Sequence, residues 1–133
     1  MIEAVLLLFL LLNLISIIIY TFKIGISPMP SSFKSRLQIL NLLKDSSNNN
    51  IIDLGSGFGI LSIFLASRLP KKNIIAYEIS LVPWAISIIL KKVLNIKNLH
   101  IYRKNYLKED LHNSILVCYL FPKGMELLED KLF

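Results

Sequence analysis

The stretch IIDLGSGFGILSIFLASR, residues 51–68, decides the fold. A short apolar run ends at Asp53, glycines follow at positions 55, 57 and 59, and an apolar helical pattern then begins. Glycine permits a tight turn and lets the backbone approach a ligand closely, because no Cβ occupies that space. A helix that starts there offers unpaired N–H groups at its N-terminus. The stretch therefore predicts a strand, a turn and a helix that together hold a nucleotide-like ligand.

The spacing of the glycines separates two classes of nucleotide-binding turn. The dinucleotide-binding fingerprint is G-x-G-x-x-G/A, and its last position must be small. Here Gly55, Gly57 and Gly59 give G-x-G-x-G, and the bulky Ile60 stands where the fingerprint requires glycine or alanine. A nicotinamide-binding turn is therefore disfavoured.

Apolar strand patterns alternate with helical ones along the rest of the chain. After residues 51–54, strands are predicted for NIIAYE (73–78), LHIY (99–102) and ILVCYLF (115–121). Ser80 is expected to cap a helix that runs to about residue 95, with Pro83 in its tolerated first turn. A last helix is predicted after residue 122. This alternation predicts an α/β fold, with a parallel sheet covered by helices on both faces.

The N-terminal segment is predicted to cross a membrane. Residues 4–22 carry no charge, and a helix of that length spans roughly 28 Å, close to the thickness of the hydrocarbon layer. A cleaved signal peptide and a buried core helix are the alternatives, but a signal peptide needs a basic start and a small-residue cleavage site. Tyr20, Phe22 and Lys23 end the run, and further basic residues follow only on that side. The positive-inside rule then predicts a single-pass membrane protein whose domain faces the cytoplasm.

These patterns divide the chain into three parts: an anchor (1–24), a linker with an N-terminal helix (25–50), and a ligand-binding domain (51–133). The linker contains two prolines, and Ser31 or Ser32 is expected to cap the helix that follows it.

Composition limits the possible partners. The net charge is +6, and on a tethered domain this excess most simply faces anionic headgroups. No nucleic acid is expected as a partner, because no aromatic–basic interleaving of a known binding module accompanies the charge. The single cysteine, Cys118, excludes an intramolecular disulfide, and His100 and His112 lack metal-ligand spacing, so no metal is expected.

The pattern D-x-G-x-G-x-G at residues 53–59 resembles motif I of the class I S-adenosylmethionine-dependent methyltransferases. The resemblance implies a Rossmann-like methyltransferase sheet and S-adenosyl-L-methionine as cofactor. Glu78, at the end of the second strand, matches the acid that binds both ribose hydroxyls, and Asn105-Tyr106 matches the adenine contact after the third strand. The cofactor-binding residues implied in this way are Asp53, Gly55, Ser56, Gly57, Glu78, Ile79, Asn105 and Tyr106.

A narrower resemblance rests on the apolar N-terminal helix, the linker GISPMPSS, DLGSGFG and YLFPKGMELL. Together these look like the small membrane-anchored lysine methyltransferases, which include enzymes acting on the ATP synthase c-subunit and the adenine nucleotide translocase. The resemblance implies N-methylation of a lysine in a protein near the membrane, with Tyr119 as catalytic residue and Phe121 and Pro122 on the substrate side. The chain has Phe58-Gly59-Ile60 where that family usually has Asp-Gly-Arg.

Only four of the seven strands of that fold can be placed before residue 133. We therefore expect a C-terminally truncated sheet, with a partner or a missing segment covering the edge at residues 115–121. Two other functions remain open at this point. One is methylation of a lipid-like or quinone-like small molecule, and the other is a non-catalytic cofactor-binding or scaffold role.

Overall fold

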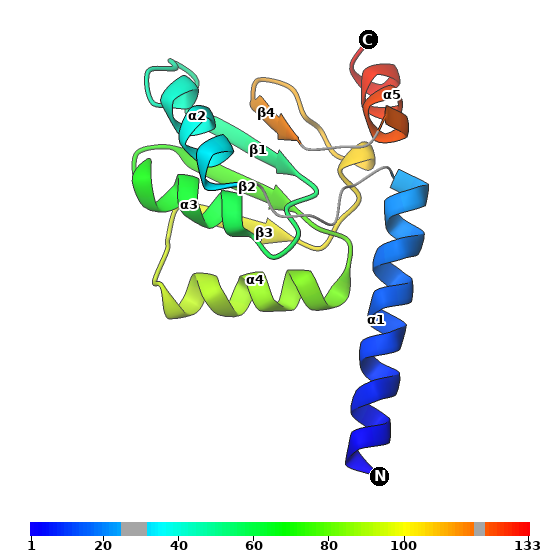
Figure 1. Cartoon of the computed structure of the whole chain (residues 1–133). Helices are drawn as coiled ribbons and strands as arrows, with labels where there is room; N and C mark the ends of the chain where they lie inside the picture. Colours follow the sequence, from blue (N-terminus) through cyan, green and yellow to red (C-terminus); the bar gives the residue numbers. More distant parts are fainter. Residues whose placement is uncertain (25–31, 119–121) are drawn as a thin grey trace.

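A computed structural model describes residues 1–24, 32–118 and 122–133 of the chain (Figure 1). The elements follow in the order α1 (Ile2–Ile24), α2 (Phe33–Leu43), β1 (Asn50–Leu54), α3 (Ile60–Arg68), β2 (Asn73–Tyr77), α4 (Leu81–Val93), β3 (Leu99–Tyr102), the 3₁₀ turn η1 (Tyr106–Lys108), β4 (Ile115–Cys118) and α5 (Pro122–Leu132).

The four strands form one sheet in the order β3-β2-β1-β4, and all neighbouring strands are parallel. The central strand β1 is buried on both faces, since Ile51, Ile52 and Leu54 are each at most 1% exposed. A parallel sheet brings the carboxyl ends of its strands to one edge. The predicted α/β fold with a parallel sheet is therefore confirmed.

Helices cover both faces of the sheet, as predicted (Figure 1). On one face α2, α3 and α4 pack over a core that includes Leu43, Leu65, Ile74 and Leu99. On the other face η1, α5 and the end of α1 pack over a second core. Its buried members are Ile52, Leu54, Tyr77, Tyr106, Leu111 and Leu128.

Two polar side chains, the partly buried Asn98 and the buried Lys72, join the loops at the amino edge of the sheet. The Asn98 side-chain amide donates to the carbonyls of Ala66, Leu69 and Lys72, each at 3.0 Å. The Lys72 ammonium, which is 6% exposed, donates to the carbonyls of Ser46 and Asn48 at 2.8 and 2.9 Å. These bonds satisfy polar groups of the loops that precede β1, β2 and β3, and they tie the three loops together. The carboxyl edge is built differently and carries the site.

Strand β4 forms one edge of the sheet in the part of the chain that the structure describes, pairing there with β1. All four of its residues are partly buried. The predicted strand extended to residue 121, but residues 119–121 lie outside the described residues. The predicted last helix is present as α5.

Helix α1 is long and apolar enough to cross a membrane. Its segment Ile2–Tyr20 has a mean hydropathy of 2.8, and none of that window is buried against the rest of the protein. Near its end, Tyr20 packs against the second core. This helix meets the requirement for a membrane span by length and composition.

Candidate cofactor site

The glycine turn joins β1 to α3 at the carboxyl edge of the sheet. Gly55, Gly57 and Gly59 all have positive φ, at 75°, 58° and 79°. L-residues with a side chain rarely adopt this conformation, so the alternating glycines follow from the path of the turn. The N–H groups of Gly55 and Ser56 both donate to the carbonyl of Tyr77, at 3.0 and 2.9 Å, and tie the turn to the end of β2.

Gly57 and Gly59 face different surroundings. A Cβ added at Gly57 would meet no heavy atom within 4 Å, so the backbone there borders open space. A Cβ at Gly59 would lie 2.9 Å from the Cβ of Ser87 on α4. Gly59 therefore permits the close approach of α3 and α4, whereas Gly57 leaves room for a ligand.

Glu78 follows β2 and points back to the glycine turn. Its Oε2 accepts a 2.6 Å hydrogen bond from the N–H of Gly57, and its Oε1 accepts a 2.9 Å bond from the N–H of Ser80. The residue is 4% exposed. A carboxylate has about four lone-pair positions, so these two bonds leave positions that can accept hydrogen bonds from the two hydroxyls of a diol. Ser80 precedes α4 as predicted, but its side chain makes no cap hydrogen bond. Its backbone N–H holds Glu78 instead.

Asp53 lies buried beneath the turn at 4% exposure. Its Oδ2 accepts a 2.5 Å hydrogen bond from the hydroxyl of Ser62 on α3. Burial raises the pKa of Asp53 to about 6, and the nearby charge of Glu78 adds to the rise, while the bond from Ser62 opposes it. The carboxylate thus joins β1 to α3. The sequence did not indicate that Ser62 contacts Asp53, because it shows Ser62 only as a polar residue in an apolar helix.

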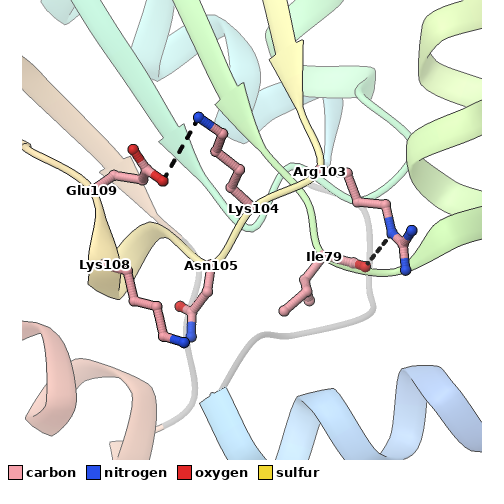
Figure 2. A pocket seen from close by; sticks show the side chains of 6 residues that line it. All are labelled: Ile79, Arg103, Lys104, Asn105, Lys108 and Glu109. Carbon is pink, nitrogen blue, oxygen red and sulfur yellow. Dashed lines mark hydrogen bonds and ion pairs between the residues drawn. The ribbon is translucent and has the colours of Figure 1, made fainter.

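Ile79 and Asn105 line one cavity of about 350 Å³ beside the ends of β2 and β3 (Figure 2). The remaining lining residues are charged: Arg103, Lys104, Lys108 and Glu109. The Arg103 Nε donates to the Ile79 carbonyl at 3.2 Å, and the Lys104 ammonium lies 3.9 Å from a Glu109 carboxylate oxygen. The family resemblance predicts that Ile79 and Asn105 contact the same ligand, and the structure places both residues at one cavity. It adds a basic lining that sequence reasoning did not assign to the site.

Asn105 and Tyr106 have different environments although they are adjacent. The side-chain oxygen of Asn105 accepts a 3.0 Å bond from the N–H of Leu107 and caps η1. Tyr106 is 1% exposed and belongs to the second core. Burial raises the pKa of Tyr106 to about 12, with a smaller contribution from Cys118, so its hydroxyl stays protonated at neutral pH. Tyr106 lies in the core beneath the site and is not among the lining residues of the cavity.

Two buried polar atoms near the turn have no hydrogen-bond partner among the described residues. They are the hydroxyl oxygen of Ser56 and the indole Nε1 of Trp84, and the hydroxyl of the core residue Tyr106 is a third such atom. Most buried polar atoms in proteins are paired, so an unpaired one asks for an explanation. For Ser56, between Gly55 and Gly57, a bound polar ligand supplies one.

The predicted substrate side is only partly described. Tyr119 and Phe121 lie outside the described residues, and Pro122 begins α5 without a described side chain. Cys118 is partly buried, and burial raises the pKa of its thiol. Its sulfur lies 3.9 Å from that of Met125. The thiol is thus a weak nucleophile at neutral pH.

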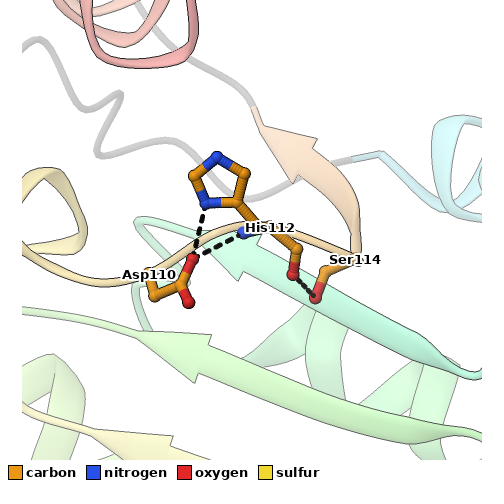
Figure 3. Close-up of polar contacts among 3 residues, drawn as sticks. All are labelled: Asp110, His112 and Ser114. Carbon is orange, nitrogen blue, oxygen red and sulfur yellow. Dashed lines mark hydrogen bonds and ion pairs between the residues drawn. The ribbon is translucent and has the colours of Figure 1, made fainter.

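Asp110, His112 and Ser114 form a local turn before β4 (Figure 3). The Asp110 carboxylate accepts bonds from the N–H of His112 at 2.9 Å and lies 2.7 Å from its ring Nδ1. These contacts lower the pKa of Asp110. Ser114 donates to the carbonyl of His112 at 3.3 Å, not to its ring, so the three residues are not arranged as a nucleophile triad. No cluster of metal-ligating residues occurs within the described ranges.

Comparisons with known proteins agree with this geometry. Residues 34–117 match the family model of the methyltransferase small domain. An RNA methyltransferase from Salinibacter ruber, solved with S-adenosyl-L-homocysteine, is 20% identical with a TM-score of 0.67, over 78% of this chain and 69% of that one. An rRNA methylase from Streptococcus thermophilus is 18% identical with a TM-score of 0.59, over 78% and 65%.

The YcgJ protein from Bacillus subtilis is 10% identical with a TM-score of 0.52, over 60% of this chain. This chain spans 33% of the length of that protein. No curated protein sequence matches the chain.

These likenesses show that the domain has the α/β fold of methyltransferases solved from other organisms. The chain belongs to the methyltransferase small domain family. The open backbone at Gly57, the lone pairs left on Glu78 and the unpaired hydroxyl of Ser56 suit an adenosyl cofactor with a diol.

Proposed function

We propose that this protein is a membrane-anchored methyltransferase that binds S-adenosylmethionine and methylates a lysine of a protein near the membrane. The observation that carries the proposal is the contact between Glu78 and Gly57. It places a buried carboxylate beside a backbone segment with open space around it.

Different residues of the chain would contact different parts of the cofactor. Glu78 would accept hydrogen bonds from the ribose diol, since two of its lone-pair positions are not used within the protein. Ile79 would pack on one side of the adenine, in the cavity that Asn105 also lines. Gly57 would let the backbone approach the ligand. The bound cofactor supplies a methyl group on a positively charged sulfur.

Methyl transfer would form an N–C bond as the S–C bond breaks, and the sulfur would keep the bonding electrons. The leaving group needs no proton, so the protein contributes mainly by positioning the two reactants. The lysine ammonium must first lose its proton, which an apolar site favours by disfavouring the charge. Tyr119 is our candidate for a hydroxyl that accepts a hydrogen bond from the amine, on the basis of the family resemblance.

Helix α1 supports anchoring, because its 23 residues include an uncharged segment long enough to span the hydrocarbon layer. Flotation of the full-length chain with lipid vesicles, followed by extraction at high pH, tests this part. A chain that stays with the lipid supports the anchor. A chain released into solution shows that α1 does not span the bilayer.

The activity is tested with the full-length chain in vesicles and cofactor labelled on its methyl group. Membrane-protein extract and lipid extract are supplied in separate reactions, and labelled protein is digested to locate methylated lysines by mass spectrometry. Label on lysine supports the proposal, and label only in lipid shows that the acceptor is a small molecule. Cofactor binding with no transfer to either extract would indicate a scaffold role. Glu78→Gln is the matched control and is expected to transfer less label, because it binds the cofactor more weakly.

A further inference from the structure

Helix α4 presents an apolar stripe on its outer face. Val82, Ile86, Ile89 and Val93 are spaced four, three and four residues apart, so they lie along one side of the helix. Ile89 is 59% exposed and Val93 is 74% exposed. The opposite side, with Pro83 and Ser87, is buried against the domain. Trp84 and Ile88 also pack against the core that includes Leu65, so α4 carries apolar side chains on its outer side as well as on its inner side.

The charged residues in the segment around this stripe are all basic. Between Glu78 and Glu109 the chain contains no acidic residue over thirty positions. It contains six basic ones: Lys91, Lys92, Lys97, Arg103, Lys104 and Lys108. Lys92 in the last turn of α4 and Lys97 in the loop that follows the helix are exposed. An apolar stripe flanked by lysines, with no acid nearby, complements an anionic lipid surface in both polarity and charge.

The position of α4 agrees with such a surface. Residues 25–31, seven in number, separate α1 from the described part of the domain, and seven residues span at most roughly 25 Å. A domain tethered so closely to a membrane helix stays near the headgroups. In Figure 1, α4 runs across the direction of α1 and lies level with the middle part of α1, on the side of the domain toward the N-terminal end of that helix. A helix placed in this way would lie parallel to the bilayer plane if α1 crossed it.

We propose that the stripe formed by Val82, Ile86, Ile89 and Val93 inserts into the headgroup boundary of an anionic membrane. The aliphatic side chains leave water, and the lysines at the end of the helix contact lipid phosphates. This second contact fixes the orientation of the domain, which a single flexible tether does not. Because α4 begins directly after Glu78 and Ser80, the cofactor site is then held at the height of the headgroups. The inference rests on the anchoring part of the proposed function.

The test uses the full-length chain in vesicles, with Cys118→Ala to remove the only cysteine. Ile89→Cys and Val93→Cys each carry an environment-sensitive fluorophore, and Lys71→Cys is the control, at an exposed position in the loop between α3 and β2. Lipids with a nitroxide near the headgroup quench fluorophores that enter the boundary. We expect quenching of at least about twofold at positions 89 and 93 in vesicles containing phosphatidylglycerol, and little at position 71. In purely zwitterionic vesicles, or at high salt, we expect the quenching at 89 and 93 to weaken.

The outcomes separate the two proposals. If the chain does not float with vesicles, the anchor is wrong. If it floats but positions 89 and 93 are quenched no more than position 71, the stripe does not contact lipid and this inference is wrong. Fluorophores shielded from water without lipid quenching, together with cross-links between copies through position 89, would show that the stripe binds a second copy of the chain. Circular dichroism of each labelled variant shows that it remains folded.

Discussion

The carboxylate of Glu78 accepts a 2.6 Å hydrogen bond from the N–H of Gly57, a residue 21 positions earlier in the chain. The bond crosses from the end of β2 to the turn after β1. It fixes an acid and an open stretch of backbone side by side at the carboxyl edge of a parallel sheet, which is where ligands bind in open α/β folds. The following predictions depend on this arrangement.

Replacing Glu78 by glutamine is expected to weaken binding of S-adenosylhomocysteine by about 10- to 100-fold. Hydrogen bonds to a charged group contribute on the order of 1.5–3 kcal/mol, and the amide offers one acceptor oxygen in place of two. Titration calorimetry on the full-length chain in detergent micelles measures the change. Glu129→Gln, an exposed acid on α5, is the control and should bind like the unmodified chain. Equal weakening in both variants would mean that general charge, not the position of Glu78, determines affinity.

The variants Gly57→Ala and Gly59→Ala are expected to separate the effect of a glycine on cofactor affinity from its effect on the stability of the fold. At Gly57 the new methyl group meets open space, so stability falls by only about 1–2 kcal/mol, from the left-handed backbone. Cofactor affinity falls because the methyl occupies the ligand's space. At Gly59 the methyl would also approach Ser87 at 2.9 Å, which adds about 1–3 kcal/mol of overpacking. Thermal unfolding and calorimetry together test the pair. A Gly57→Ala chain with normal affinity would remove Gly57 from the site.

Ser56→Ala should change affinity without lowering stability. The hydroxyl is buried and has no partner among the described residues, so its removal leaves no other group unsatisfied. If a ligand accepts its hydrogen bond, affinity should fall by roughly 2- to 10-fold, the equivalent of about 0.5–1.5 kcal/mol. A drop in unfolding temperature with unchanged affinity would instead give Ser56 a purely structural role.

Asp53 should make stability depend on pH between about 4 and 6. Its pKa is raised from 3.8 to about 6 in the folded protein, mainly by burial. Below about pH 4 the Asp53 carboxyl is protonated in both the folded and the unfolded state. Between the two pKa values the folded state keeps the proton that the unfolded state has lost, and above both values both states are ionised. The stabilising contribution is therefore full near pH 4 and is lost as the pH rises past 6, an effect on the order of 3 kcal/mol.

The difference in unfolding free energy between the unmodified chain and Asp53→Asn measures this effect in a mild detergent. Asparagine keeps a side-chain oxygen for the Ser62 hydroxyl and does not titrate. The unmodified chain should lose stability relative to Asp53→Asn from pH 4 to 6.5. A difference that stays constant over this range would show that the Asp53 carboxyl is not desolvated.

The sequence was sufficient to predict the class of fold and to place the glycine turn after the first strand of the sheet. Some sequence features determine the conformation of their own segment, so they can be interpreted without a structure. These features are the hydrophobic periods of strands and helices, Pro83 and the alternating glycines. Glu78 could be placed for the same reason, because it directly follows an apolar strand that ends at Tyr77.

Contacts between distant segments could not be predicted in this way. The bond from Ser62 to Asp53, the approach of Gly59 to Ser87 and the basic lining around Asn105 each require two elements to be placed in space. The burial of Tyr106 in the second core is a further example, because a loop sequence does not show which side chain turns inward. Helix α4 is apolar over most of its surface, so its pattern could not identify the exposed stripe.

The most direct measurement is a crystal structure of the chain with S-adenosylhomocysteine. We expect both ribose hydroxyls to lie within hydrogen-bond distance of the Glu78 carboxylate, and the ligand to pass next to the backbone of Gly57. A ligand bound elsewhere, with Glu78 still bonded only to Gly57 and Ser80, would contradict this expectation.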